Sequence, residues 1–112
     1  KNISNYKINI DIKSNQVKQE IIEVETSLSL LPVKIDIEKI DTKVIYSTII
    51  ELEKGLVNKK EIEKIILINI PSKIYPDLRK IFVFIFENSG FKNLNISEKI
   101  DFQKLYNQKK TQ

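Results

Sequence analysis

The side chains with the most obvious chemistry are two pairs of glutamates, each pair separated by one residue. The first pair is Glu51 and Glu53, and the second is Glu61 and Glu63. Paired carboxylates can serve as a general acid and a general base. A spacing of two in a strand or loop more simply gives solvated carboxylates, and nothing in the sequence marks a substrate cleft beside them. We therefore expect that the protein is not an enzyme.

The residue types that are missing exclude most other kinds of active site. The 112 residues include no Cys and no His, which excludes a thiolate zinc site, a cysteine nucleophile and an imidazole base. The only glycines are Gly55 and Gly90, so neither a dinucleotide-binding nor a phosphate-binding glycine loop can be present. We expect no metal ion and no cofactor.

Composition and charge are typical of one small globular domain, which we place over residues 1–112. The chain has 22 Ile and no Ala, and this β-branched content favours strands over helices.

The net charge is +4, but the lysines are scattered and there is one Arg, so we expect no nucleic-acid partner. No apolar stretch reaches the roughly 20 residues of a membrane span. We expect a cytoplasmic protein, and the absence of Met suggests a processed or trimmed chain.

Apolar and polar residues alternate along four stretches of the first half, which predicts four antiparallel strands between about residues 6 and 53. The residues expected on the buried face are Ile8, Ile10 and Ile12; Ile22, Val24, Thr26, Leu28 and Leu30; Val33, Ile35 and Ile37; and Val44, Tyr46, Thr48, Ile50 and Leu52. Short links between the stretches favour a meander or Greek key. The opposite face of the last stretch carries Ile45 and Ile49, where another chain could dock.

The second half predicts helices, which makes the fold class α+β. Periodicity does not decide whether residues 56–70 form a fifth strand, a helical turn or an ordered crossover loop. A helix is expected over about 76–88, ending at Gly90. A second is expected over about 101–109, with Ser97 or Asp101 as its cap. The second helix carries the stripe Phe102, Leu105 and Tyr106.

The first helix is apolar around nearly all of its circumference. One stripe holds Leu78, Ile81, Phe82 and Ile85, and further apolar residues lie at Val83, Phe84 and Phe86. A single sheet covers only one side of such a helix, and exposure of the rest would forgo about 1.5–3 kcal/mol per side chain. We predict that a second subunit covers Phe82, Val83, Phe84 and Phe86. The alternative is that residues 56–70 cover this side.

Four sequence motifs occur in an order that resembles SecB, the bacterial protein-export chaperone family. Residues 49–55 read IIELEKG, similar to the end of the family's last strand, and residues 74–79 read IYPDLR, similar to the family's LFPYAR. Residues 91–96 read FKNLNI, similar to FPPLNL, and residues 100–106 read IDFQKLY, similar to VDFxxLY. The resemblance covers about residues 44–110.

The resemblance implies a four-stranded antiparallel sheet with two helices and a crossover loop, which we place over about residues 54–73. It also implies a dimer of dimers in which the first helix lies between subunits, and we expect a dimer or a dimer of dimers. It also implies a holdase that binds unfolded precursor polypeptides in an apolar groove without nucleotide. Our candidate groove residues are Leu56, Val57, Ile62, Ile65, Ile66, Phe102, Leu105 and Tyr106. By motif position, Ile49 and Glu51 would dock the SecA translocase motor.

A second interpretation keeps the fold but changes the partner. SecB-like relatives include chaperones attached to toxin–antitoxin systems, so the chain could be an interaction module dedicated to one partner, such as an antitoxin. Familiar family members are acidic, whereas this chain is basic, and a basic surface would weaken docking to a cationic site on SecA.

Overall fold

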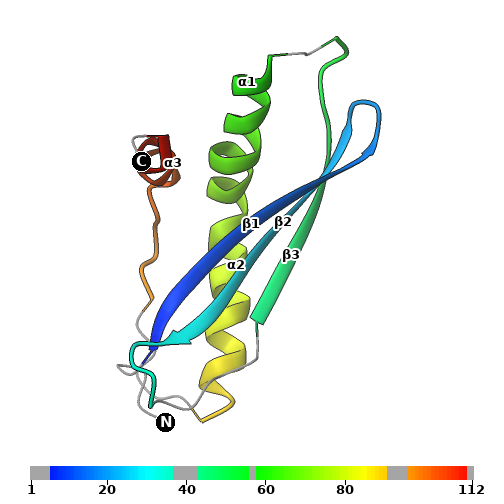
Figure 1. Ribbon diagram of the computed structural model, residues 1–112. Helices are drawn as coiled ribbons and strands as arrows, with labels where there is room; N and C mark the ends of the chain where they lie inside the picture. Colours follow the sequence, from blue (N-terminus) through cyan, green and yellow to red (C-terminus); the bar gives the residue numbers. More distant parts are fainter. Residues whose placement is uncertain (1–5, 37–42, 56–57, 91–95, 111–112) are drawn as a thin grey trace.

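A three-stranded antiparallel sheet lies diagonally across one long helix (Figure 1). The computed structural model describes residues 6–36, 43–55, 58–90 and 96–110. The strands are β1 (Tyr6–Lys18), β2 (Ile21–Pro32) and β3 (Lys43–Glu51), and they are adjacent in chain order. The expected α+β class and antiparallel pairing are confirmed.

The expected strand at Val33, Ile35 and Ile37 is not present in the described part of the chain. Residues 33–36 form bends and a turn, and Ile37 lies outside the described residues. The ladder between β1 and β2 ends where Pro32 pairs with Tyr6, because proline has no N–H to extend it. Ile35 is fully exposed, so its alternation with polar neighbours did not indicate a buried face.

Where the sheet contributes to the core, the inner face of β2 lies at the centre. Its five predicted residues are all buried: Ile22, Val24, Thr26, Leu28 and Leu30. β1 and β3 flank β2, and their inward residues are mostly half-buried, including Ile8, Ile10 and Ile12 on β1. The period-two pattern therefore predicted the buried face of the sheet correctly.

Residues 59–87 form one continuous helix instead of a crossover loop followed by a helix. It consists of α1 (Lys59–Lys64), the π-helical segment η2 (Ile65–Asn69) and α2 (Ile70–Glu87). The helix begins at Asn58, whose side-chain Oδ1 accepts hydrogen bonds from the N–H groups of Lys60 and Glu61 at 3.0 and 3.3 Å. The expected loop over 54–73 is therefore wrong for residues 59–73.

The expected start of the helix at about residue 76 was wrong because both prolines were interpreted as boundaries. Pro71 lies just after the junction of η2 and α2, and Pro76 lies inside α2 with an exposed ring, so neither proline begins or ends the helix. The overlooked signal was Asn58 followed three residues later by Glu61, the spacing of a helix N-terminus. The C-terminal end at Glu87, before Gly90 at φ 96°, agrees with the prediction within a residue.

The last helix, α3 (Phe102–Lys110), lies beside the η2 part of the long helix (Figure 1). Asp101 caps it, since the Asp101 Oδ1 accepts a hydrogen bond from the Lys104 N–H at 3.0 Å. The connector before α3 is attached to α2 by two hydrogen bonds to main-chain oxygens. The Tyr75 hydroxyl donates to the Ser97 carbonyl at 2.6 Å, and the Arg79 Nε donates to the Ile96 carbonyl at 3.0 Å.

One side of α2 faces the sheet and the other faces outward. Leu78, Phe82 and Phe86 are at most 2% exposed within the single chain, because the helix presents them to β2 and β3. The exposed apolar residues of α2 are Ile81, Phe84 and Ile85, at 42%, 67% and 36%.

The expected interface set on α2 is therefore corrected. Phe82 and Phe86 belong to the core of their own chain, and Val83 packs partly against that core. The predicted residue that remains outward is Phe84. The alternative, that residues 56–70 cover the outward side, is wrong for residues 59–70, because they extend the same helix along its axis.

Candidate functional site

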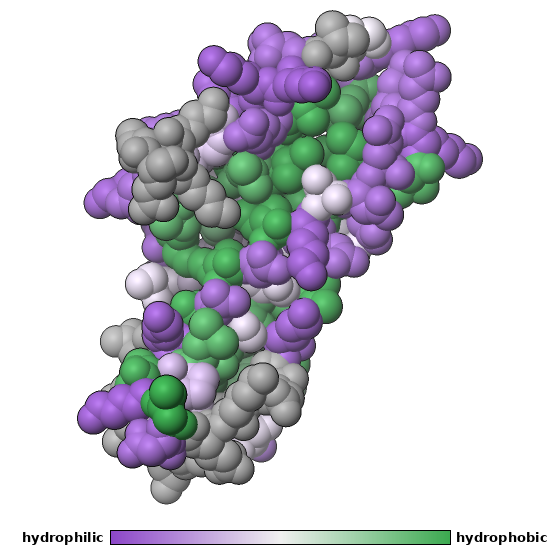
Figure 2. Space-filling model, in the orientation of Figure 1, coloured by the Kyte–Doolittle hydropathy of each residue, from purple (hydrophilic) through white to green (hydrophobic). Residues whose placement is uncertain are grey.

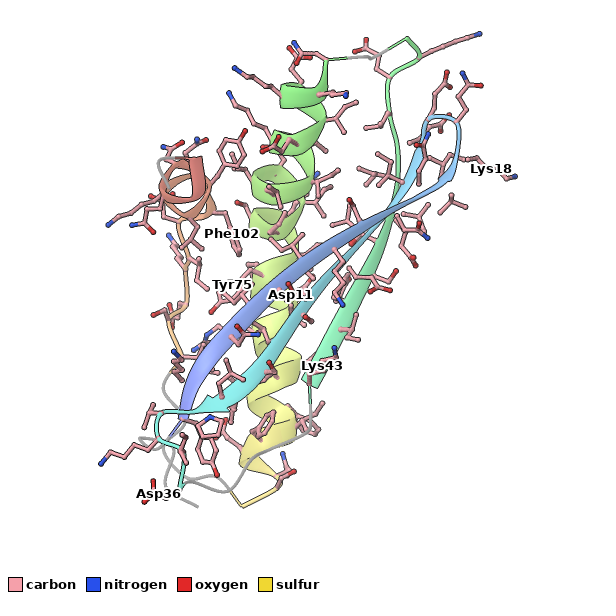
Figure 3. All side chains as sticks on the ribbon, in the orientation of Figure 1. Asp11, Lys18, Asp36, Lys43, Tyr75 and Phe102 are labelled. Atoms are coloured by element: carbon pink, nitrogen blue, oxygen red, sulfur yellow. The ribbon has the colours of Figure 1, made fainter. Side chains whose placement is uncertain are left out.

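A cleft of about 260 Å³ separates β1 from α3. Its lining is mainly apolar and comes from three elements: Ile10, Asp11 and Ile12 of β1, Leu67 of η2, and Phe102, Leu105, Tyr106 and Gln108 of α3. Phe102 is held in place by an edge-to-face contact with Tyr75, with ring centroids 6.0 Å apart (Figure 3). The anchored connector therefore fixes α3 at a distance from β1 that leaves the cleft open.

A second cleft, of about 270 Å³, continues the first toward α1. It is lined by Ser14 of β1 together with Lys59, Ile62, Glu63, Ile66 and Leu67 of α1 and η2. Leu67 lines both clefts, so they lie next to each other, and we call the two together the β1 groove. Figure 2 shows hydrophobic side chains gathered in a hollow in the upper half of the molecule, with hydrophilic side chains around it.

The structure brings together five of the eight residues proposed for the groove. Phe102, Leu105 and Tyr106 line its α3 end, and Ile62 and Ile66 line its α1 end. Ile65 is half-buried and lines neither cleft. Leu56 and Val57 lie outside the described residues.

The sequence prediction missed three apolar residues of the β1 groove. Leu67 lies in the run of apolar residues that could not be assigned to a helix or strand, so its direction was unknown. Ile10 and Ile12 belong to the alternating face of β1 and were expected to pack only beneath the sheet. They reach the groove because β1 is the edge strand, with no strand beyond it among the described residues.

The outer face of the sheet carries the residues proposed for docking a partner. Ile45 and Ile49 of β3 are 49% and 61% exposed, and Glu51 is exposed at the end of the same strand. Glu23 of β2 pairs in register with Ile49, and its carboxylate accepts a hydrogen bond from the Ser47 hydroxyl at 2.7 Å. The surface around Ile49 is therefore acidic, although the whole chain has a charge of +4.

Burial raises the pKa of the Tyr75 phenol above its ordinary value of 10.0, and the positive charge of Arg79 partly opposes this shift. A raised pKa keeps the hydroxyl protonated, so it remains a donor to the Ser97 carbonyl. The described residues contain no cluster of side chains suited to a metal ion, and none of their helices is long and apolar enough to cross a membrane.

Comparisons with known proteins agree with the motif order. The family model "SecB: Preprotein translocase subunit SecB" matches residues 2–112. A curated relative from Pelagibacter ubique (strain HTCC1062), named "Putative protein-export protein SecB", is 43% identical over 107 residues. That match covers 96% of this chain and 76% of the relative. No solved structure matches the chain.

Neither match favours the alternative of a module dedicated to an antitoxin, since both descriptions concern protein export or translocation. The family model covers nearly the whole chain, and the identity to the relative extends over almost all of it. This chain therefore belongs to the SecB family of protein-export chaperones.

Proposed function

We propose that the protein is a holdase that binds unfolded precursor polypeptides in the β1 groove before their export from the cytoplasm. The observation that carries this proposal is that two apolar clefts share Leu67 and together follow β1, the edge strand of the sheet in the described part of the chain. A groove that runs along a strand edge suits an extended chain better than a compact ligand.

Binding in this groove requires no chemical step. Burial of apolar client side chains against Ile62, Leu67 and Leu105 would supply the driving force, at about 25 cal/mol per Å² of apolar area removed from water. Since this force is non-directional, the groove would accept many sequences, as a chaperone for precursors requires.

Suppression of aggregation of a chemically unfolded client tests the proposal. Leu105→Lys is the informative variant, because Leu105 is 43% exposed and lines the groove, so the change adds a charge to the groove without unfolding the chain. Ile45→Lys is the matched control, since Ile45 is 49% exposed on the outer sheet face. We expect Leu105→Lys to lose suppression and Ile45→Lys to keep it. Wild-type protein that fails to suppress aggregation would contradict the proposed function.

We also propose that the acidic outer surface around Ile49 and Glu51 docks the SecA motor. The exposed isoleucine would provide apolar contact, and Glu51 together with Glu23 would provide the negative charge that a cationic partner site needs. Glu51→Lys should weaken SecA binding in a titration at low salt. Lys13→Glu is the control. Lys13 lies on β1, on the same outer face of the sheet, and this variant should not weaken SecA binding.

For the outward side of α2 we propose a second copy of the chain as the partner, giving a dimer or a dimer of dimers of single-domain subunits. Ile81, Phe84 and Ile85 are adjacent on one side of α2, and α1 and η2 continue the helix instead of covering them. Phe84→Glu should lower the molecular mass measured by light scattering. Val17→Glu, at a residue that is 51% exposed near the hairpin end of β1, should leave the mass unchanged.

A further inference from the structure

The π-helical segment η2 contains one more residue than an α-helical turn. Its geometry is shown by the Ile70 N–H, which donates to the Ile65 carbonyl five residues earlier instead of four. The segment ends at Asn69, two residues before Pro71. Because Pro71 has no N–H, an α-helix would lose its hydrogen bond to the Leu67 carbonyl at this point in any case, which lowers the cost of the irregular turn.

An uninterrupted α-helix would present a different side of α1 to the sheet. Steps of three or four residues along an α-helix return to the same side. From Pro71, which is buried against the core, such steps lead to Leu67, Lys64 and Lys60. A regular helix would therefore direct Lys64 toward β1.

The side of α1 that the structure presents to β1 is displaced by one residue. Leu67 lines the groove, as it would in a regular helix. The other lining residues of α1 and η2 are displaced: Ile66, Glu63 and Lys59 each lie one position before the residue that a regular helix would place there, and Ile62 lies beside them. Exposure agrees with this displacement, because Ile62 and Glu63 are partly buried whereas Lys60 and Lys64 are exposed.

We propose that the extra residue of η2 is a positioning element that sets which side of α1 lines the β1 groove. It turns α1 by about 100° relative to α2. This rotation places Ile62 in the groove, where a regular helix would place Glu63, and places Glu63 where a regular helix would place Lys64. The inference rests on the proposed function for its effect on clients, but the helix register itself can be measured without a client.

The consequence for the groove is a change in both polarity and charge at its α1 end. With η2, the charged residues lining this end are Lys59 and Glu63, which balance, and Ile62 supplies apolar surface. Without the extra residue, Lys60, Glu63 and Lys64 would line it, with a net positive charge and no isoleucine from α1. The apolar groove would then stop near Leu67.

Deletion of Asn69 tests the rotation, because this residue lies in η2 and its side chain is exposed. We expect the deletion to weaken binding of an unfolded client by about tenfold, the effect of replacing a buried isoleucine contact with a carboxylate. Adding Glu63→Ile and Lys64→Glu to the deletion restores the original lining of the groove, so binding should recover. Recovery distinguishes a wrong register from general damage, and circular dichroism checks that the helix is retained.

A labelling experiment follows the register directly in the chain without the deletion, which has no cysteine of its own. Ile62→Cys should react more slowly with a thiol reagent than Lys64→Cys, and the deletion of Asn69 should reverse that order. Equal rates for the two single variants in the full chain would overturn the proposal. If the wild-type protein and the deletion variant bind clients equally well, the positioning role is wrong and the proposed function stands. If the wild-type protein binds no client, the proposed function is wrong.

Discussion

The hydrogen bond from Tyr75 to the connector before α3 gives a prediction whose size can be worked out from its surroundings. Tyr75→Phe removes the hydroxyl that donates to the Ser97 carbonyl at 2.6 Å, but it keeps the ring that contacts Phe102. Ser97 is exposed, so its carbonyl can accept a hydrogen bond from water in the variant. The expected loss is therefore that of one ordinary hydrogen bond, about 1 kcal/mol of unfolding free energy, without the larger penalty of an unsatisfied buried group.

The measurement is urea denaturation at a fixed protein concentration, because the unfolding free energy of an oligomer depends on concentration. Tyr46→Phe is the matched control, since Tyr46 is a half-buried tyrosine on β3. We expect Tyr75→Phe to lower the urea midpoint and Tyr46→Phe to leave it nearly unchanged. Identical midpoints for wild type and both variants would refute the reasoning.

The pH dependence provides a second check on the same hydroxyl. The pKa of Tyr75 is raised in the folded state above the ordinary 10.0, so the folded chain retains a proton that the unfolded chain releases. The stability that this proton contributes is present below about pH 10 and is lost as the pH rises through the raised pKa. Tyr75→Phe should therefore reduce the fall in unfolding free energy above pH 10. An unchanged alkaline slope would mean that another group causes the fall.

Five further substitutions, at four positions, test the packing of the chain by denaturant unfolding. Thr26→Val should raise the unfolding free energy by about 1 kcal/mol, because the buried Thr26 hydroxyl has no hydrogen-bond partner among the described residues; a decrease would indicate a bound water. Glu20→Gly should stabilise by roughly 0.5–1 kcal/mol, because Glu20 has φ 77°, and Glu20→Ala should give no such gain. Phe82→Ala should cost about 3–5 kcal/mol, whereas Phe84→Ala should change the stability of the single chain by less than about 0.5 kcal/mol; similar losses would contradict the assignment of inner and outer sides of α2.

The alternation of apolar residues was sufficient to predict the sheet, but not to count its strands. On β2 every predicted inward residue is buried, because three strands and a helix enclose that face. The same alternation at Val33 and Ile35 does not form a strand. Alternation shows only that residues could form a strand with one apolar face, and in the described chain no strand pairs with these two residues.

The groove was only partly predictable, because the direction of its residues depends on a helix register that the sequence pattern hides. Ile62 and Ile66 were identified as candidates from their apolar character, but periodicity could not tell helix from loop in a segment with an irregular turn.

The outward side of α2 was misassigned for a related reason. A helix that is apolar all round does not reveal which residues face the sheet, and the packing of Leu78 against the sheet decides that Phe82 and Phe86 lie inside.

The way in which α1 is ordered has a consequence for the behaviour of the protein on heating. The six residues of α1 include none that is fully buried, and a helix of this length does not nucleate by itself in water. α1 is helical because the helix continues into it from α2 through η2, and Asn58 caps its N-terminus. Fraying should therefore start at Lys59 and proceed toward Leu67 while the sheet and α2 are still folded, so that warming shortens the groove from one end and makes its usable length a function of temperature.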